Sequence, residues 1–209
     1  MQRFSKENLP GLYDSLAQRD KDLEKILLKY GYPPVWVRPN SFETLVLTIL
    51  EQQVSLASAF AAYKKLKERI AITPGNFLLL NDDQLRACYF SRQKIGYVRI
   101  LANAIHTGEV DLDAFETLPD DEVRVKLKKL KGIGDWTVDI YLIHALQRMD
   151  VFPTGDLALV NAIRMVKQLP HATKDELLLM SELWKPYRSI ATMLFWHFYI
   201  REKNIKILH

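Results

Sequence analysis

The chain has 209 residues, enough for one globular unit or two small lobes, and 48% of them are hydrophobic, as in proteins that bury a core. Its single cysteine, Cys88, excludes an internal disulfide framework, a four-cysteine zinc site and a cysteine-ligated iron–sulfur cluster. No window reaches the roughly 18 apolar residues that a membrane helix requires, and the first residues lack a signal-peptide core. We therefore expect an intracellular protein without membrane contact. A net charge of +4 favours a polyanionic partner without establishing one.

Helical patterns dominate the chain in order from the N-terminus. Pro33, Pro34 and Pro39 make the stretch around Trp36 extended, and we interpret it as a crossover between two lobes. Next comes an apolar stripe at helical spacing, which predicts one buried helix face and consists of Phe42, Leu45, Val46, Ile49 and Leu50. Four pairs with capping-box spacing mark helix starts: Asn40 with Glu43, Asn81 with Gln84, Thr117 with Asp120, and Thr173 with Glu176. No Asn-Gly or Asp-Gly hairpin turn occurs, so the fold class is predicted to be all-α.

A glycine-rich turn lies between two helical patterns, where residues 130–137 read LKGIGDWT. Gly132 and Gly134 permit a tight turn and leave no Cβ to keep a phosphate from the amide groups. The helix that starts near Asp135 presents unpaired N–H groups and its positive dipole end to the same place. On these glycines alone, a plain helix–loop–helix connection is the favoured explanation of the turn. The preceding pattern adds basic residues that favour a DNA phosphate, although they also suit a solvated face: Arg124, Lys126, Lys128, Lys129 and Lys131.

One carboxylate stands out downstream of this turn. Asp156 follows Pro153 and Gly155 and precedes an apolar helical pattern. Taken alone it is typical of an N-cap residue. One apolar helix and a turn separate it from Gly134, so the chain can return the carboxylate to the neighbourhood of the hairpin. None of the five histidines has metal-ligand spacing, and we expect neither a catalytic metal nor another cofactor.

The hairpin followed by Asp156 resembles the helix-hairpin-helix (HhH-GPD) DNA glycosylase superfamily, in the branch of the 3-methyladenine DNA glycosylase II type. The resemblance extends to residues 42–55, to residues 85–94 with Ser91 and Lys94, and to residues 184–189 followed by Trp196. It implies a base-excision repair enzyme that hydrolyses the N-glycosidic bond of alkylated purines such as 3-methyladenine and 7-methylguanine. The partner would be double-stranded DNA with damaged bases, and the protein a monomer associated with DNA in the nucleoid or nucleus.

The resemblance also assigns roles to individual residues. Asp156 would be the catalytic carboxylate, and Trp136 stands where bifunctional members carry a Schiff-base lysine, which implies a monofunctional enzyme. The base pocket would consist of Trp136, Ile140, Ala158 and Trp196. The DNA contacts would come from Gln52, Gln53, Lys131, Gly132, Ile133, Gly134 and Thr137, with Gln53 filling the space that the flipped nucleotide leaves. Backbone carbonyls of Lys128, Leu130 and Ile133 would hold a monovalent cation.

Two helical lobes are therefore expected, with the active-site cleft between them. One lobe spans residues 41–150 and ends with the hairpin, and the other combines residues 1–40 with 151–209. Ile140 and Ala158 depart from the residues of one bacterial relative, which affects the expected substrate range rather than the reaction. The alternative is a non-catalytic helix-hairpin-helix module that binds DNA, since such a module needs the glycine turn but not Asp156, Trp136 and Trp196.

Overall fold

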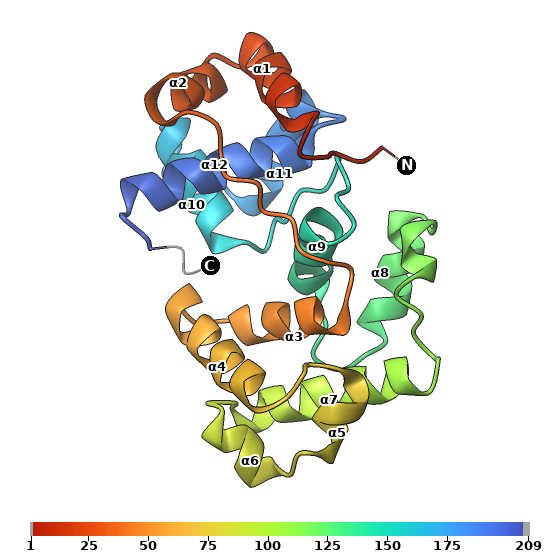
Figure 1. The fold of residues 1–209 in the computed structure, drawn as a ribbon. Coiled ribbons are helices and arrows are strands. Elements are labelled where there is room, and N and C mark those ends of the chain that lie inside the picture. The colour runs from red at the N-terminus through yellow and green to blue at the C-terminus, as the bar shows by residue number, and fades with distance from the viewer. Residues whose placement is uncertain (1, 207–209) are drawn as a thin grey trace. The chain divides into compact units, whose positions relative to one another are not determined.

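The computed structural model describes residues 2–206 and confirms the all-α fold class (Figure 1). Within these residues the regular structure is helical, apart from an isolated bridge between Arg3 and Arg148. In the same part of the chain, none of the helices has the length and apolar character needed to cross a membrane.

The chain forms two compact units, one made of the residues up to Val37 together with Leu142–Lys206, the other of Arg38–Tyr141. The first unit contains α1 (Leu9–Arg19), α2 (Lys21–Tyr30), α10 (Leu157–Val166), α11 (Lys174–Ser181), the short 3₁₀ helix η2 (Glu182–Trp184) and α12 (Arg188–Glu202). The second contains α3 (Phe42–Glu51), α4 (Leu56–Arg69), α5 (Pro74–Leu79), α6 (Asp82–Ala87), α7 (Arg92–His106), η1 (Ala114–Glu116) and α8 (Asp120–Lys128). The division falls inside α9 (Asp135–His144), whereas the predicted lobes divide at residues 40 and 150; those lobes stay a prediction.

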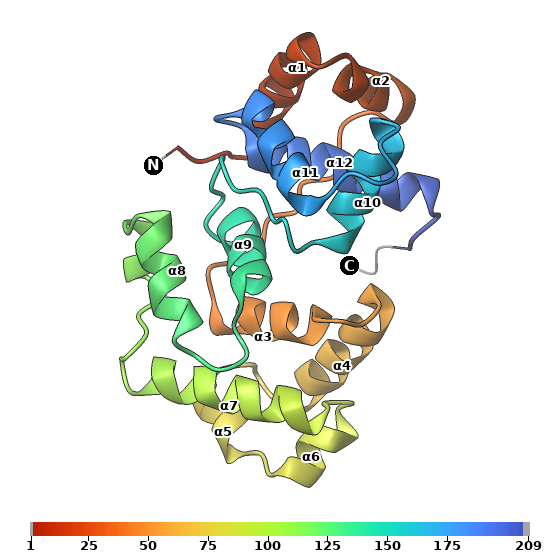
Figure 2. The same cartoon turned by 180° about the vertical axis from the view of Figure 1, so that it is seen from behind.

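Helix α12 is the centre of the first unit. Its residues from Ser189 to His197 are all buried, which is typical of a helix surrounded by other elements rather than lying on a surface. It packs against α1 and α2 on one side and against α10 on another (Figure 2). Because α10 begins immediately after Asp156, this packing fixes where that carboxylate lies within the unit.

A half-buried ion pair joins the end of α10 to the start of α2. Asp20 caps α2 and accepts a hydrogen bond from the Asp22 amide, while the Lys167 ammonium lies 2.8 Å from both of its carboxylate oxygens. The indole of Trp184, which is fully buried, donates to the same carboxylate at 2.9 Å. Burial alone raises the pKa of Asp20, but the hydrogen bonds from Lys167, Trp184 and Asp22 outweigh it and hold the pKa below its usual value.

In the second unit α3 packs against α4 and α7, and α7 also supports α5 and α6. The predicted apolar stripe of α3 is confirmed, because each of its five residues is at most 5% exposed. The capping boxes at Asn81 with Gln84 and at Thr173 with Glu176 are confirmed as well.

Two of the predicted helix starts are wrong. Ser41, not Asn40, caps α3 by accepting the Thr44 amide, and Asn40 instead donates to the Leu112 carbonyl at 2.7 Å. Pro119, not Thr117, occupies the N-cap position of α8. In both places the residue predicted as the cap makes hydrogen bonds elsewhere, because the Asn40 amide reaches a distant carbonyl and the Thr117 hydroxyl donates to the Ala114 carbonyl.

We expect D20N to lower the free energy of unfolding at pH 7 by about 2 kcal/mol, because Asn keeps the cap but removes the charge that Lys167 faces. The folded pKa of Asp20 is depressed, so this contribution is present above the unfolded pKa of about 3.9 and is lost as pH falls through the folded value. Urea unfolding at pH 7 and at successively lower pH measures the difference. The exposed pair of Asp83 with Arg86 gives the matched control, D83N, which should change stability by less than about 1 kcal/mol.

Candidate active site and nucleic-acid interface

Asp156 is indeed the N-cap of α10. Its Oδ1 accepts the backbone N–H of Leu159 at 2.8 Å, and the backbone of Asp156 is extended, as an N-cap requires. The same oxygen accepts a second hydrogen bond, at 3.0 Å, from the indole Nε1 of Trp196 on α12. Two donors from two helices therefore fix the orientation of this half-buried carboxylate.

The Trp196 indole is itself held in place by the other residues of the first unit. The imidazole of His144 stacks on it with ring centroids 5.4 Å apart and planes 13° from parallel, and Trp36 meets its edge at 6.4 Å. The Nδ1 atom of His144 lies 2.6 Å from the Trp36 carbonyl oxygen. Trp196 is only 8% exposed, so most of its surface serves packing. The structure thus gives Trp196 a role that the sequence did not suggest, which is to hold Asp156.

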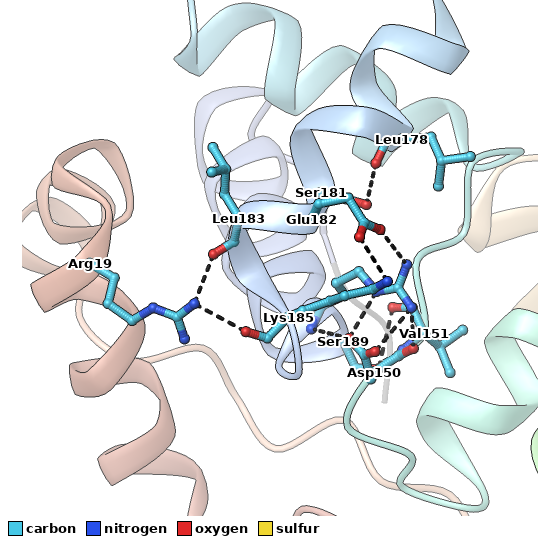
Figure 3. Close-up of polar contacts among 10 residues, drawn as sticks. Arg19, Asp150, Val151, Leu178, Ser181, Glu182, Leu183, Lys185 and Ser189 are labelled. Carbon is cyan, nitrogen blue, oxygen red and sulfur yellow. Dashed lines mark hydrogen bonds and ion pairs between the residues drawn. The ribbon is translucent and has the colours of Figure 1, made fainter.

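The segment that leads to Asp156 is fastened to the start of α12. Arg188 forms a bidentate pair with Asp150, with Nε–Oδ1 and Nη2–Oδ2 distances of 2.8 and 3.0 Å. Ser189 pairs with the backbone of Val151, which follows Asp150. Its Oγ accepts the Val151 N–H at 2.9 Å and donates to the Val151 carbonyl at 3.3 Å (Figure 3). These contacts give a physical reason why the pattern at residues 184–189 occurs together with Asp156. They position the backbone segment that leads to Asp156.

The hairpin between α8 and α9 uses its two glycines differently. Gly132 has a φ of +98°, and a Cβ there would lie 2.1 Å from the Cγ atom of Tyr97, so the position requires glycine for both torsion and space. A Cβ on Gly134 would meet no atom within 4 Å. Gly134 is exposed and directly precedes α9, while Ile133 between the glycines is buried. The fold therefore needs Gly132, whereas the space beside Gly134 is open to a ligand.

The basic residues near the hairpin do not act as one cluster. Arg124 pairs with Asp139 at 2.6 Å and with Asp135 at 3.2 Å, and Lys128 pairs with Asp135 at 2.8 Å. Burial raises the pKa of Asp139 to about 6, and the pairing with Arg124 opposes this rise without cancelling it. The three remaining members of the predicted basic cluster are exposed: Lys126, Lys129 and Lys131.

The loop after α3 meets the hairpin through one side chain. The Nε2 atom of Gln52 donates to the Gly132 carbonyl and to the Thr137 hydroxyl, both at 2.9 Å. Thr137 is only 2% exposed, so its hydroxyl lies inside the hairpin rather than on the surface. Gln53 follows with a φ of +55° and an exposed side chain. This loop therefore presents Gln53 outward while Gln52 faces the protein.

The predicted pocket residues fall into two pairs. Trp136 and Ile140 lie one turn apart on α9 in the second unit, the first half-buried and the second 4% exposed. Ala158 and Trp196 belong to the first unit. A pocket built from all four stays a prediction.

The predicted cation ligands lie in the hairpin. The Leu130 carbonyl accepts the Ile133 amide at 3.1 Å, and a carbonyl has a second lone pair for an ion. The cation at the carbonyls of Lys128, Leu130 and Ile133 stays a prediction. Among residues 2–206 no group of three or more His, Cys, Asp or Glu side chains is placed to hold a metal.

Sequence reasoning missed three residues that shape these sites. Lys94 donates from Nζ to the carbonyls of Leu50 and Gln52, at 2.6 and 3.0 Å. Asp139 secures Arg124, and His144 supports Trp196. Lys94 lay within a recognised segment, but its partners are more than 40 residues away and no spacing pattern reveals them.

A family model described as the HhH-GPD superfamily base excision DNA repair protein matches residues 46–189, which include both the hairpin and Asp156. The chain belongs to this superfamily. It is 31% identical over 187 residues to DNA-3-methyladenine glycosylase 1 of Schizosaccharomyces pombe, an alignment that covers 87% of this chain and 82% of the relative.

Solved structures of the superfamily agree with the fold. The S. pombe 3-methyladenine DNA glycosylase in complex with abasic DNA matches with a TM-score of 0.84 and 28% identity, covering 95% of this chain and all of that chain. A DNA-3-methyladenine glycosidase from Bacillus halodurans matches with a TM-score of 0.78 and 26% identity, covering 98% and 95% of the two chains.

We expect the two hairpin glycines to separate folding from binding. G132A should lower the free energy of unfolding by about 2–4 kcal/mol, because the torsion disfavours Ala and the Tyr97 ring must move. G134A should leave stability within about 1 kcal/mol of the native value yet weaken binding to undamaged duplex DNA about 10-fold, with a shallower salt dependence. Chemical denaturation and a salt titration of DNA affinity measure both. Unchanged DNA affinity in G134A would show that the hairpin is only a connection between helices.

Proposed function

We propose that the protein is a monofunctional DNA glycosylase that removes alkylated purines from double-stranded DNA, with Asp156 as its catalytic carboxylate. The observation that carries the proposal is the pair of hydrogen bonds that Leu159 and Trp196 donate to Oδ1 of Asp156, in a chain whose superfamily is base excision repair. The names of the S. pombe and B. halodurans relatives support 3-methyladenine among the substrates.

The chemistry needs a fixed negative charge. As the N-glycosidic bond breaks, positive charge develops on the deoxyribose, and a preorganised carboxylate stabilises it more in the transition state than in the ground state. Asp156 needs no reorganisation for this task, because two donors from α10 and α12 already hold it. The same carboxylate can orient or deprotonate the attacking water. An N-alkylated purine is cationic and leaves without a general acid, so one carboxylate suffices.

The duplex has to be held while the base is flipped out of the stack. The amide groups at the start of α9 and the open space beside Gly134 suit one backbone phosphate, and the exposed Lys131 adds a positive charge next to them. These contacts carry no sequence information, as a lesion-searching enzyme requires. Gln53, exposed at the loop after α3, is proposed to fill the vacated position. The expected monomer and intracellular location stay predictions.

The decisive experiment is release of bases from methylated duplex DNA, with the products identified by chromatography. The wild-type protein should release 3-methyladenine and 7-methylguanine, and D156N should reduce the single-turnover rate about 10²- to 10³-fold. Asn caps a helix as well as Asp does and can accept the same two hydrogen bonds, so the loss would not come from unfolding. Thermal stability and DNA affinity close to the wild type would verify this.

W196F is a companion variant that tests the hydrogen bond alone, because Phe keeps a ring against His144 but lacks the indole N–H. It should slow release about 10-fold, corresponding to about 1.5 kcal/mol for one hydrogen bond to a charged group. Base release by D156N within a few-fold of the wild type, with normal DNA binding, would favour the non-catalytic DNA-binding module.

We also expect no strand cleavage beyond base removal. Trp136 is the second residue of α9, and an indole has no amine with which to form a Schiff base. Treatment with borohydride during the reaction should trap no covalent protein–DNA complex, and strands should stay intact until heat or alkali is applied. A trapped complex that disappears in K131M would identify the exposed Lys131 as a lyase nucleophile and contradict the monofunctional assignment.

A further inference from the structure

The loop after α3 and the hairpin are the two elements proposed to touch DNA, and one amide group joins them. The Gln52 side chain offers two N–H donors, and its Nε2 contacts two acceptors, the Gly132 carbonyl and the Thr137 hydroxyl, each at 2.9 Å. Both acceptors belong to the hairpin, one in the turn and one in the first turn of α9. The donors of Gln52 are thus used within the protein, although the residue lies directly before the exposed Gln53.

The backbone of the same loop is also held by a side chain of α7. The ammonium group of Lys94 donates to the carbonyls of Leu50 and Gln52, which α3 leaves unpaired at its C-terminal end. Lys94 is half-buried, and this burial lowers the pKa of its ammonium group. A cation at a helix C-terminus also interacts favourably with the helix dipole. Gln53 therefore projects from a backbone that Lys94 holds on one side and Gln52 holds on the other.

The hairpin rests on the same helix. Tyr97, three residues after Lys94 on α7, places its ring where a Cβ of Gly132 would be. One face of α7 thus supports both the loop after α3 and the hairpin, and the Gln52 hydrogen bonds link these two elements to each other. A displacement of the hairpin cannot occur without breaking the Gln52 hydrogen bonds or moving the loop that carries Gln53.

We propose that Gln52 is a positioning residue that couples the grip of the hairpin on a phosphate to the insertion of Gln53 into the duplex, with Lys94 as the brace of the loop. This inference rests on the proposed function, because it assumes that both elements contact DNA. Its consequence is that loss of the Gln52 donors impairs both phosphate binding and insertion, whereas changes at Gly134 or Gln53 impair only one of them.

The test compares two readouts across three variants. Affinity for an undamaged duplex reports the hairpin. Insertion is reported by the fluorescence of 2-aminopurine placed beside a tetrahydrofuran abasic-site analogue, measured with enzyme in saturating excess. G134A should weaken affinity alone, and Q53A should reduce the fluorescence change alone. Q52M, which keeps the length of the side chain but has no donors, should do both, weakening affinity about 3- to 10-fold and reducing the rate of the fluorescence change about 10-fold.

Two further variants keep the test valid if Q52M is unstable. T137V removes one acceptor at nearly constant volume and should produce smaller losses in both readouts, while T137S retains the hydroxyl and should restore wild-type behaviour. In the Q52M background T137V should add little, since the bond it removes is already lost. The exposed Gln18 on α1 gives the matched control Q18M, which should match the wild type in both readouts.

The possible outcomes separate this inference from the proposed function. If the wild-type protein neither binds the duplex nor changes the probe fluorescence, the proposed function fails. A different result would overturn only the coupling role of Gln52 and leave the glycosylase assignment standing. In that case the wild type both binds the duplex and changes the fluorescence, but folded Q52M or T137V loses affinity without losing insertion, or loses neither.

Discussion

Unpaired N–H groups at the start of a helix are the constraint on which both candidate sites depend. Every α-helix leaves such groups at its N-terminus, and a side chain, water or ligand has to satisfy them. At α10 the chain supplies its own acceptor, the carboxylate of Asp156. The hydrogen bond to the helix start fixes the position of this carboxylate. At α9 the preceding residue is Gly134, which has no side chain to offer. One helix start therefore holds the proposed catalytic carboxylate, and the proposed phosphate site lies at the other.

Charge near α9, beside the proposed phosphate site, is partly balanced within the protein. Asp135 and Asp139 occupy the same helix and together neutralise Arg124 and Lys128. The pair of Asp139 with Arg124 is mostly buried, so it also joins α8 to α9 and keeps the two helices of the hairpin in register. The exposed lysines that remain supply long-range attraction to a polyanion, which falls as salt is added.

Local sequence patterns predicted the parts of this protein that local interactions determine. The stripe on α3, the capping boxes at Asn81 and Thr173 and the start of α9 at Asp135 follow from residues only a few positions apart. The caps at Asn40 and Thr117 were wrong because those side chains make other hydrogen bonds, in the case of Asn40 to a residue far along the chain. Periodicity cannot reveal that Trp196 donates to Asp156, or that Lys94 supports the loop before Gln53, since each pair is about 40 residues apart in sequence.

The contrast between the two hairpin glycines bears on how such a sequence changes over time. Gly132 is protected by the folded state itself, because almost any replacement collides with Tyr97. Gly134 has no such protection, since a side chain there meets nothing in the protein. A descendant that lost its need for DNA would keep Gly132 and drift freely at Gly134. If Gly134 has its proposed role, retention of this glycine among distant descendants records selection for binding, separable from selection for stability.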